Sequence, residues 1–414
     1  MNSTASFPRA AMRARRHQTA PGRPSDRHPD LTKNSFNLEV DEDYCWIDTG
    51  GCQQPETSWP SARRRREDTV PQPLRVALIG LDHWYTAISL AERFTAHPDV
   101  ELVGIADPDA DRLHEVLARG GVSGVSGSAD EFLADDSIDL VASFVSTERN
   151  PAICVAAAQN GKHILSVKPL ARTLDQATEI VQAVRDAGVT FLGAESRGRH
   201  SAHQQQLRTW IAEGRFGKLL TASYGMWATL PQGWPGSSDP GWFVDAERTP
   251  GGAWIDHSIY QLDQLRWLAG ARVAKVSGTV ANLKYGDLSV EDYGLALVEF
   301  DNGLLAQIED TWTAVRGGGR TAMNIVGTDG AIAYDALTGR LSLAGDLQPF
   351  GGWVHRTPEA MHSGAIDELV ATVRGKQDPI STVEDAWDNL AACEAFYQAA
   401  KTGTPVTPKR LPAS

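Results

Sequence analysis

The spacing of apolar positions changes near residue 217 of the chain. Between residues 74 and 194, short apolar runs alternate with stretches in which apolar residues recur every three or four positions. This alternation predicts strands and helices in turn, and such units build a parallel sheet with helices on both faces. The predicted strands cover 75–79, 101–106, 140–145, 163–166 and 189–194, and the predicted helices cover 86–96, 110–118 and 173–187.

Beyond Gly217 the apolar residues follow a period of two, which predicts an antiparallel sheet. Its strands are expected at 219–226, 273–279, 294–299, 303–311 and 321–326, with helices at 252–268 and 386–400. The sequence therefore predicts an α/β protein in which a doubly wound parallel sheet precedes an α/β domain with an open antiparallel sheet. We place these domains at 74–195 and 196–408, and we expect residues 1–73, rich in Pro, Arg and Ser, to be a disordered tail and linker.

Net charge limits the expected binding partners, and the cysteines and apolar stretches indicate the cellular location. The 414 residues carry a formal net charge of −13, which disfavours nucleic acid and anionic membranes as partners. The four cysteines are too scattered to indicate a disulfide framework. No apolar stretch approaches the roughly 20 residues that span a bilayer, and no apolar signal-peptide core is present. We expect a cytoplasmic protein.

The stretch Gly80-Leu81-Asp82-His83-Trp84-Tyr85 follows the first predicted strand, where dinucleotide-binding chains carry G-x-G-x-x-G. Only the first glycine is present. Asp82 occupies the second glycine position, so a negative charge faces the expected place of the pyrophosphate. We nevertheless expect Gly80, Asp82, His83 and Trp84 to contact a cofactor in a Rossmann-type domain.

Asp107 ends the second strand, where an acidic residue hydrogen-bonds the adenosine ribose and repels a 2′-phosphate. This position favours NAD over NADP, although an aspartate before a proline is also a common turn residue.

Two further segments carry candidate chemistry. Lys168 follows the strand at 163–166, at the crevice where doubly wound sheets bind ligands, and a lowered pKa of its ammonium would suit proton donation. Asp256, Tyr260 and Asp263 fall on one face of the helix at 252–268, with His257 at its edge. A carboxylate, a histidine and a tyrosine at a helix start can perform general acid–base chemistry.

Six stretches in order give the chain a resemblance to the Gfo/Idh/MocA oxidoreductase family. They are GKHILSVKPLA, GRFGKL, GGAWIDHSIYQLDQLRWLAG, VEFDNG, VGTDGAIA and KTGTPV, within 74–408. The resemblance implies an NAD(P)-binding Rossmann domain and a substrate domain whose open sheet often oligomerises. It thus implies a homo-oligomeric NAD(P)-dependent dehydrogenase or reductase that acts on the CH–OH groups of a sugar, cyclitol or related polyol.

The family's functional residues transfer only in part. Its E-K-P lysine corresponds to Lys168, and Thr147 keeps a position near the nicotinamide. Its D-x-G-x-H-x-x-D pattern begins at Asp256 and ends at Asp263, with Tyr260 where the family has its catalytic histidine. We therefore expect Lys168 and Tyr260 to act as a pair, oriented by Asp256 and assisted by His257.

Substrate contacts are expected from Arg199, Trp242 and Asp263. Arg199 matches an arginine that the family often carries, and aromatic faces such as that of Trp242 suit the apolar side of a pyranose. Two histidines, His200 and His203, are weak evidence for a metal, and none is predicted. Two alternatives remain open, a redox-neutral NAD-using glycosidase or epimerase and a ligand-binding relative without catalysis.

Overall fold

The computed structural model describes residues 72–119, 121–347, 353–355 and 365–412. Of the predicted tail and linker at 1–73, all but the last two residues lie outside the described part of the chain. The predicted domain bounds remain predictions.

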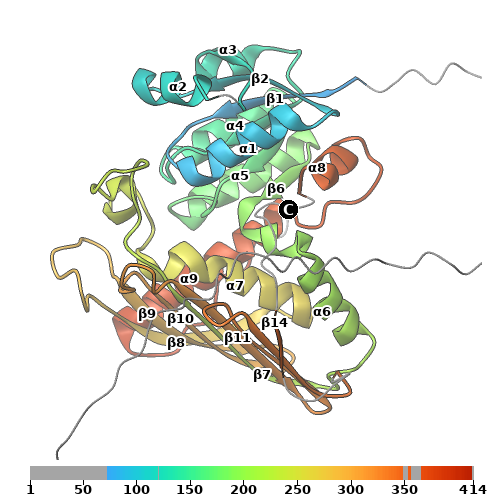
Figure 1. Ribbon diagram of the computed structural model, residues 1–414, viewed down its shortest axis with the longest axis vertical. Helices are drawn as coiled ribbons and strands as arrows, with labels where there is room; N and C mark the ends of the chain where they lie inside the picture. Colours follow the sequence, from blue (N-terminus) through green and yellow to red (C-terminus); the bar gives the residue numbers. More distant parts are fainter. Residues whose placement is uncertain (1–71, 120, 348–352, 356–364, 413–414) are drawn as a thin grey trace, which may run out of the picture. The chain divides into compact units, whose positions relative to one another are not determined.

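The first sheet is parallel and has six strands (Figure 1). Its strands are β1 (Leu74–Ile79), β2 (Val100–Ala106), β3 (Val125–Ser126), β4 (Leu140–Ser143), β5 (His163–Ser166) and β6 (Phe191–Gly193). They lie in the order β3-β2-β1-β4-β5-β6, and every neighbouring pair is parallel. The chain adds strands to one side of β1 as far as β3 and then to the other side from β4 onward, so the strand order switches between β1 and β4. This order confirms the predicted doubly wound, Rossmann-type sheet.

Helices connect these strands. They are α1 (Trp84–Ala96), α2 (Ala110–Leu117), α3 (Ala129–Ala134), α4 (Asn150–Gln159) and α5 (Leu174–Ala187). Neither α3 nor α4 was predicted from the sequence. A capping box of Ser128 and Glu131 begins α3, and Thr173 caps the first turn of α5. Such caps satisfy amides that have no partner within the helix.

The second sheet has eight strands, and α7 (Ala253–Ala269) and α9 (Val383–Thr402) lie on one of its faces (Figure 1). The strands are β7 (Leu219–Trp227), β8 (Val273–Ala281), β9 (Tyr293–Phe300), β10 (Leu305–Thr311), β11 (Arg320–Gly327), β12 (Gly330–Asp335), β13 (Arg340–Gly345) and β14 (Trp353–His355). The helices that follow β6 are η1 (Ala194–His200), α6 (Ala202–Ala212), η2 (Gly241–Val244), α7 (Ala253–Ala269), α8 (Ala365–Val373) and α9 (Val383–Thr402). Of these, α7 packs on β9 and β10, and α9 packs on β8.

Most neighbours in the second sheet are antiparallel, as predicted, but β7 pairs with β10 in parallel. The period of two does not show which strands pair, so this parallel pair was not predicted. Here the long connection containing η2 and α7 separates β7 from β8, so β7 instead lies between β10 and β11.

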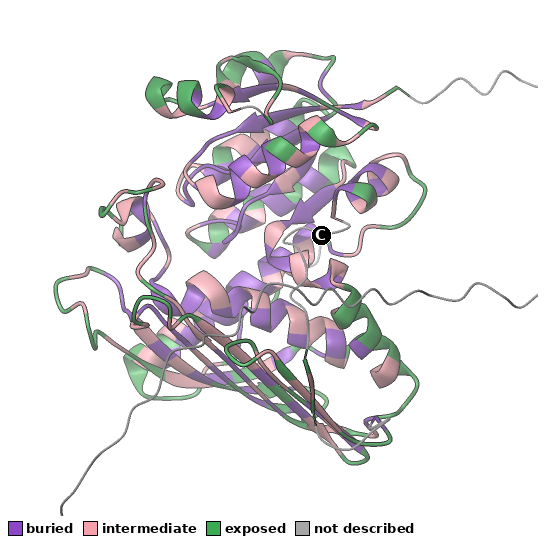
Figure 2. Ribbon diagram, in the orientation of Figure 1, coloured by how far each residue is buried: buried purple, intermediate pink, exposed green. Residues whose placement is uncertain are grey.

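Burial in the second sheet follows the period of two that its sequence displays. In β9, and in β10 from Leu305 to Asp310, buried residues alternate with partly or fully exposed ones. Figure 2 shows buried and exposed parts along the strands of this sheet. The buried side chains face α7 and α9, where Trp254 stacks on Phe396 with ring centroids 3.7 Å apart. This packing fixes α7, the helix that carries Asp256, His257 and Tyr260.

Candidate active site

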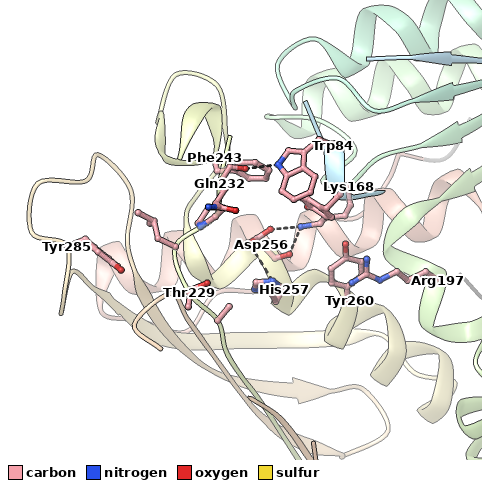
Figure 3. A pocket seen from close by; sticks show the side chains of 14 residues that line it. Trp84, Lys168, Arg197, Thr229, Gln232, Phe243, Asp256, His257, Tyr260 and Tyr285 are labelled. Carbon is pink, nitrogen blue, oxygen red and sulfur yellow. Dashed lines mark hydrogen bonds and ion pairs between the residues drawn. The ribbon is translucent and has the colours of Figure 1, made fainter. Parts of the chain in front are cut away.

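A cavity of about 600 Å³ brings the predicted acid–base residues together. Lys168 enters it from the segment after β5, and Asp256, His257 and Tyr260 enter it from the first two turns of α7 (Figure 3). The carboxyl end of the parallel sheet therefore meets the start of α7, although the two segments are 88 residues apart.

Lys168 and Asp256 form a buried ion pair. The Lys168 side chain is 3% exposed, and its Nζ donates to Asp256 Oδ1 over 2.6 Å and to the carbonyl oxygen of Asp256. Burial alone would favour the neutral amine, but the Asp256 carboxylate outweighs it and raises the pKa of Lys168 above its usual value. The expected lowering of this pKa is therefore wrong, and Lys168 remains an ammonium across the working pH range.

Asp256 also contacts an indole and an imidazole. Its Oδ2 accepts a hydrogen bond from Trp312 Nε1 over 3.2 Å and lies 3.5 Å from His257 Nε2. Burial opposes the charge of Asp256, yet His257, Lys168 and the indole N–H together hold its pKa below the ordinary value. Burial lowers the pKa of His257 to about 4, so its imidazole is neutral near pH 7.

Tyr260 contributes its ring to a contact with two cations. Lys168 Nζ lies 5.0 Å from the ring centroid and Arg197 Cζ lies 3.9 Å from it. The predicted Lys168–Tyr260 pair is thus a cation–π contact, while both hydrogen bonds of the ammonium go to Asp256. The Tyr260 hydroxyl points to the side of the cavity that carries Lys168 (Figure 3).

The carboxylate of Asp82 is turned toward the loop after β4. It accepts a hydrogen bond from the Ser146 N–H over 2.7 Å, and it lies 3.6 Å from Arg149 and 3.7 Å from Arg112. The two guanidinium groups offset the charge that occupies the second glycine position. Glu148, which precedes Arg149 in the chain, pairs with Arg248 over 2.7 Å.

His83, Trp84 and Trp242 lie side by side with different exposure to the cavity. Trp84 lines it and donates from Nε1 to the Gln232 carbonyl. His83 is buried, and its Nδ1 lies 3.0 Å from the Tyr85 hydroxyl. Trp242 is also buried and donates to the Asp82 carbonyl, while the adjacent Phe243 reaches the cavity. The structure thus places Trp242 behind the cavity wall rather than on it.

Residues at the carboxyl end of the parallel sheet fit a dinucleotide. Gly80 has a φ of +94°, and a Cβ there would lie 2.5 Å from Val145, so a side chain is excluded. A hollow of about 290 Å³ is lined by Gly80, Asp107, Ser128 and Arg149. Within the described part of the chain, the buried Thr147 hydroxyl has no hydrogen-bond partner. Gly80, Asp107 and Thr147 are the positions expected to contact the cofactor.

Asp107 orders the loop that begins this site. Its two carboxylate oxygens accept hydrogen bonds from the Leu81 N–H over 2.7 Å and the Asp109 N–H over 2.9 Å. Each carboxylate oxygen can accept a second hydrogen bond, so Asp107 can still accept one from a ribose hydroxyl.

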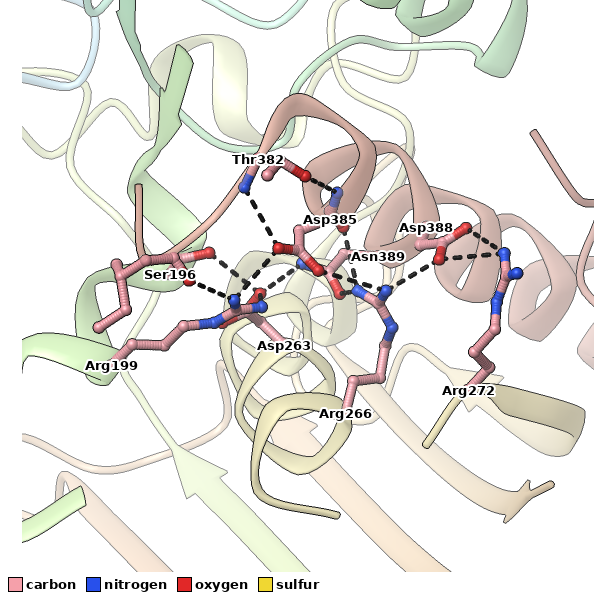
Figure 4. Close-up of polar contacts among 10 residues, drawn as sticks. Ser196, Arg199, Asp263, Arg266, Arg272, Thr382, Asp385, Asp388 and Asn389 are labelled. Atoms are coloured by element: carbon pink, nitrogen blue, oxygen red, sulfur yellow. Dashed lines mark hydrogen bonds and ion pairs between the residues drawn. The ribbon is translucent and has the colours of Figure 1, made fainter. Parts of the chain in front are cut away.

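Arg199 and Asp263, both expected at the substrate, are absent from the cavity lining and lie in a buried polar network (Figure 4). Arg199 donates to Asp263 from Nε over 2.9 Å and from Nη2 over 2.6 Å. Ser196 and Asn389 also donate to Asp263, and Asp385 pairs with Arg199. We therefore propose that this pair holds η1, α7 and α9 together.

Arg197 is a charged residue of the cavity lining that was not predicted from the sequence. It and Arg199 are two positions apart on the 3₁₀ helix η1, so their side chains leave in different directions. The sequence alone offered no way to choose between them. Tyr85 was identified only as a departure from glycine, yet it also lines the cavity.

Among the described residues, no cluster of three or more His, Cys, Asp or Glu side chains could hold a metal ion. No described helix is long and apolar enough to cross a membrane.

Comparisons with known proteins agree with this geometry. Residues 74–194 match the model of an oxidoreductase family with an NAD-binding Rossmann fold, and residues 204–333 match the GFO/IDH/MocA C-terminal domain. The scyllo-inositol 2-dehydrogenase (NAD(+)) of Bacillus subtilis (strain 168) is 30% identical over 348 residues, which cover 80% of this chain and 96% of that protein. The 1,5-anhydro-D-fructose reductase of Ensifer adhaerens is 28% identical over 306 residues, covering 73% of this chain and 90% of that protein.

A solved structure extends the likeness of fold. Levoglucosan dehydrogenase in complex with NADH superposes with a TM-score of 0.72 at 20% identity, covering 82% of this chain and 100% of that one.

Proposed function

The chain belongs to the Gfo/Idh/MocA family of oxidoreductases with an NAD-binding Rossmann fold, and on this premise we propose that its cavity oxidises or reduces a CH–OH carbon of a sugar, cyclitol or related polyol. The observation that carries the proposal is the buried Lys168–Asp256 pair on the wall of the cavity. Relatives named for anhydrofructose and scyllo-inositol support the substrate class. Bound NAD accepts or supplies the hydride.

Lys168 binds the reacting oxygen. Because Asp256 keeps it charged and fixes its position, the ammonium can donate a hydrogen bond to that oxygen and stabilise the negative charge that develops on it. Its raised pKa makes it a poor proton acceptor, so the proton of the reacting hydroxyl goes elsewhere.

Of the groups on the cavity wall, the Tyr260 hydroxyl and the His257 imidazole are our two candidates for exchanging that proton. We assign the transfer to Tyr260, whose hydroxyl lies on the Lys168 side of the cavity (Figure 3). His257 is a second candidate because it is neutral near pH 7 and faces Asp256.

The test is NADH formation from NAD⁺ and a panel of polyols and sugars. Lys168→Met is expected to lower kcat by roughly 10²- to 10⁴-fold, the range typical of positioned acid–base and charge-stabilising groups, while NADH affinity changes little. Lys275→Met is the matched control, since Lys275 is an exposed lysine on β8 that pairs with Glu299. Equal activity in both variants would remove Lys168 from the reaction.

Tyr260→Phe and His257→Asn separate the two proton-transfer assignments. A large loss of kcat in the first variant and a small one in the second is expected, and the reverse result assigns the proton to His257. Substrate conversion without accumulation of NADH would favour the redox-neutral alternative. The homo-oligomer and the cytoplasmic location remain predictions.

A further inference from the structure

Arg197 places a guanidinium in the cavity, and no carboxylate of the described residues pairs with it. Among the residues that the structure describes, its contact is with the Tyr260 ring, 3.9 Å from Cζ to the ring centroid (Figure 3). Its neighbour on η1, Arg199, is instead saturated by Asp263 and Asp385. A cation that faces a cavity unpaired is unusual in a chain whose net charge is −13.

The cavity as a whole is positively charged. Among the described residues, its lining holds two cations, Lys168 and Arg197, and one carboxylate, that of Asp256. His257 adds no charge near pH 7, because burial lowers its pKa to about 4. Since Lys168 is already paired with Asp256 over 2.6 Å, the excess charge resides on Arg197.

The contact with Tyr260 leaves the guanidinium able to bind a ligand. A cation–π contact uses the flat face of the group and contributes about 0.5–2 kcal/mol. The five N–H donors lie in the plane of the guanidinium, and this planar fork matches the oxygens of a carboxylate or phosphate.

From the unpaired Arg197 and the net charge of the lining we infer that the substrate carries an anionic oxygen group, a carboxylate or a phosphate ester, which Arg197 binds. Tyr260 then links two functions, because its ring contacts Arg197 while its hydroxyl points to the side of the cavity that carries Lys168 (Figure 3). The inference rests on the proposed function and narrows its substrate class from polyols in general to acidic sugars or sugar phosphates.

The test compares glucose, glucuronate and glucose 6-phosphate as probes with NAD⁺. Wild type is expected to favour one anionic probe over glucose in kcat/KM by roughly 10- to 100-fold, the range of a charge-assisted hydrogen bond. Arg197→Met is expected to abolish this preference, mainly by raising KM for the anionic probe, and Arg197→Lys to restore part of it. Which probe is favoured distinguishes a carboxylate from a phosphate.

Arg208→Met is the matched control. Arg208 also stacks on an aromatic ring, with Cζ 4.6 Å from the Trp267 centroid, but it lies outside the cavity lining. This variant should keep the preference. Equal turnover of all three probes by wild type, or an equal change for all of them in Arg197→Met, would overturn the anion site.

Calorimetric titration of each probe into the NADH-loaded protein separates this inference from the proposed function. Binding of an anionic probe that is weakened in Arg197→Met supports the anion site even without turnover. Oxidation of neutral polyols, combined with no effect of Arg197→Met on binding of either anionic probe, overturns the anion site alone. If NADH itself does not bind, the proposed function fails. The anion site is then tested by titrating the anionic probes into wild type and Arg197→Met without NADH, where weaker binding to the variant is expected.

Discussion

Substitution of Asp263 by asparagine should destabilise the fold and leave the substrate site intact. The Asp263 side chain is 2% exposed and accepts four hydrogen bonds, two of them from Arg199 at 2.9 and 2.6 Å and the others from Ser196 and Asn389 at 3.0 Å each. The asparagine amide removes the charge and directs N–H groups at donors.

The expected loss in free energy of unfolding depends on the ion pair that Arg199 keeps after the substitution. Removing one partner of a buried ion pair costs roughly 3–5 kcal/mol. Arg199 keeps its contact with Asp385 at 3.1 Å, which places the expected loss at the lower end, about 3 kcal/mol. With a urea dependence of about 2 kcal/mol per M, the unfolding midpoint falls by roughly 1.5 M.

The assay is urea unfolding followed by tryptophan fluorescence, together with KM for any substrate that the wild type oxidises. Glu299→Gln is the control, since its ion pair with Lys275 spans 3.5 Å between side chains that are about half exposed, and it should cost less than about 1 kcal/mol. An Asp263→Asn variant as stable as wild type, but with a raised KM, would refute the structural role and return Asp263 to the substrate site.

Three further substitutions test the cofactor site and its surroundings. Asp82→Asn keeps an acceptor for the Ser146 N–H but frees Arg149, so NADH should bind roughly threefold more tightly at low salt by calorimetry, whereas weaker binding would give the charge a role of its own. Asp107→Ser should raise affinity for NADPH relative to NADH by roughly tenfold, and an unchanged ratio would place the ribose elsewhere. Burial raises the pKa of Glu195 to about 8 from 4.5, so its stabilising contribution, complete below about pH 4.5, is lost as the pH rises toward about 8. Glu195→Gln cannot ionise and should lose less stability than wild type between about pH 5 and pH 8 in urea unfolding; parallel losses would argue against a buried, protonated Glu195.

Regular periodicity was enough to predict most of the fold. Five of the six strands in the parallel sheet follow from alternating apolar runs and helical spacing, and α7 follows from the apolar positions that pack it on β9 and β10. The strand β3 has only two residues, both exposed, and it was not predicted. The pairing of strands that lie far apart in the chain could not be predicted from the sequence. The parallel β7–β10 pair depends on where the connection through α7 returns the chain, which no local pattern records.

The grouping of the candidate residues in one cavity was predicted where one element carries several of them. Asp256, His257 and Tyr260 share the start of α7, and the strand-end position of Lys168 predicted its place beside them. The directions in which side chains point and the protonation of Lys168 were harder to predict. The sequence could not show that Arg197 rather than Arg199 faces the cavity, because the turn of η1 decides it. Nor could it show that Asp256 lies close enough to Lys168 to raise its pKa.

The most direct test of the account is a titration of NADH into the wild-type protein, followed by quenching of tryptophan fluorescence. Trp84 lines the cavity and should report a nicotinamide that reaches it. We predict saturable quenching at one NADH per chain, relieved by competing NAD⁺. Absence of saturable binding at millimolar NADH would contradict the claim that the site beside Lys168 and Asp256 performs hydride transfer.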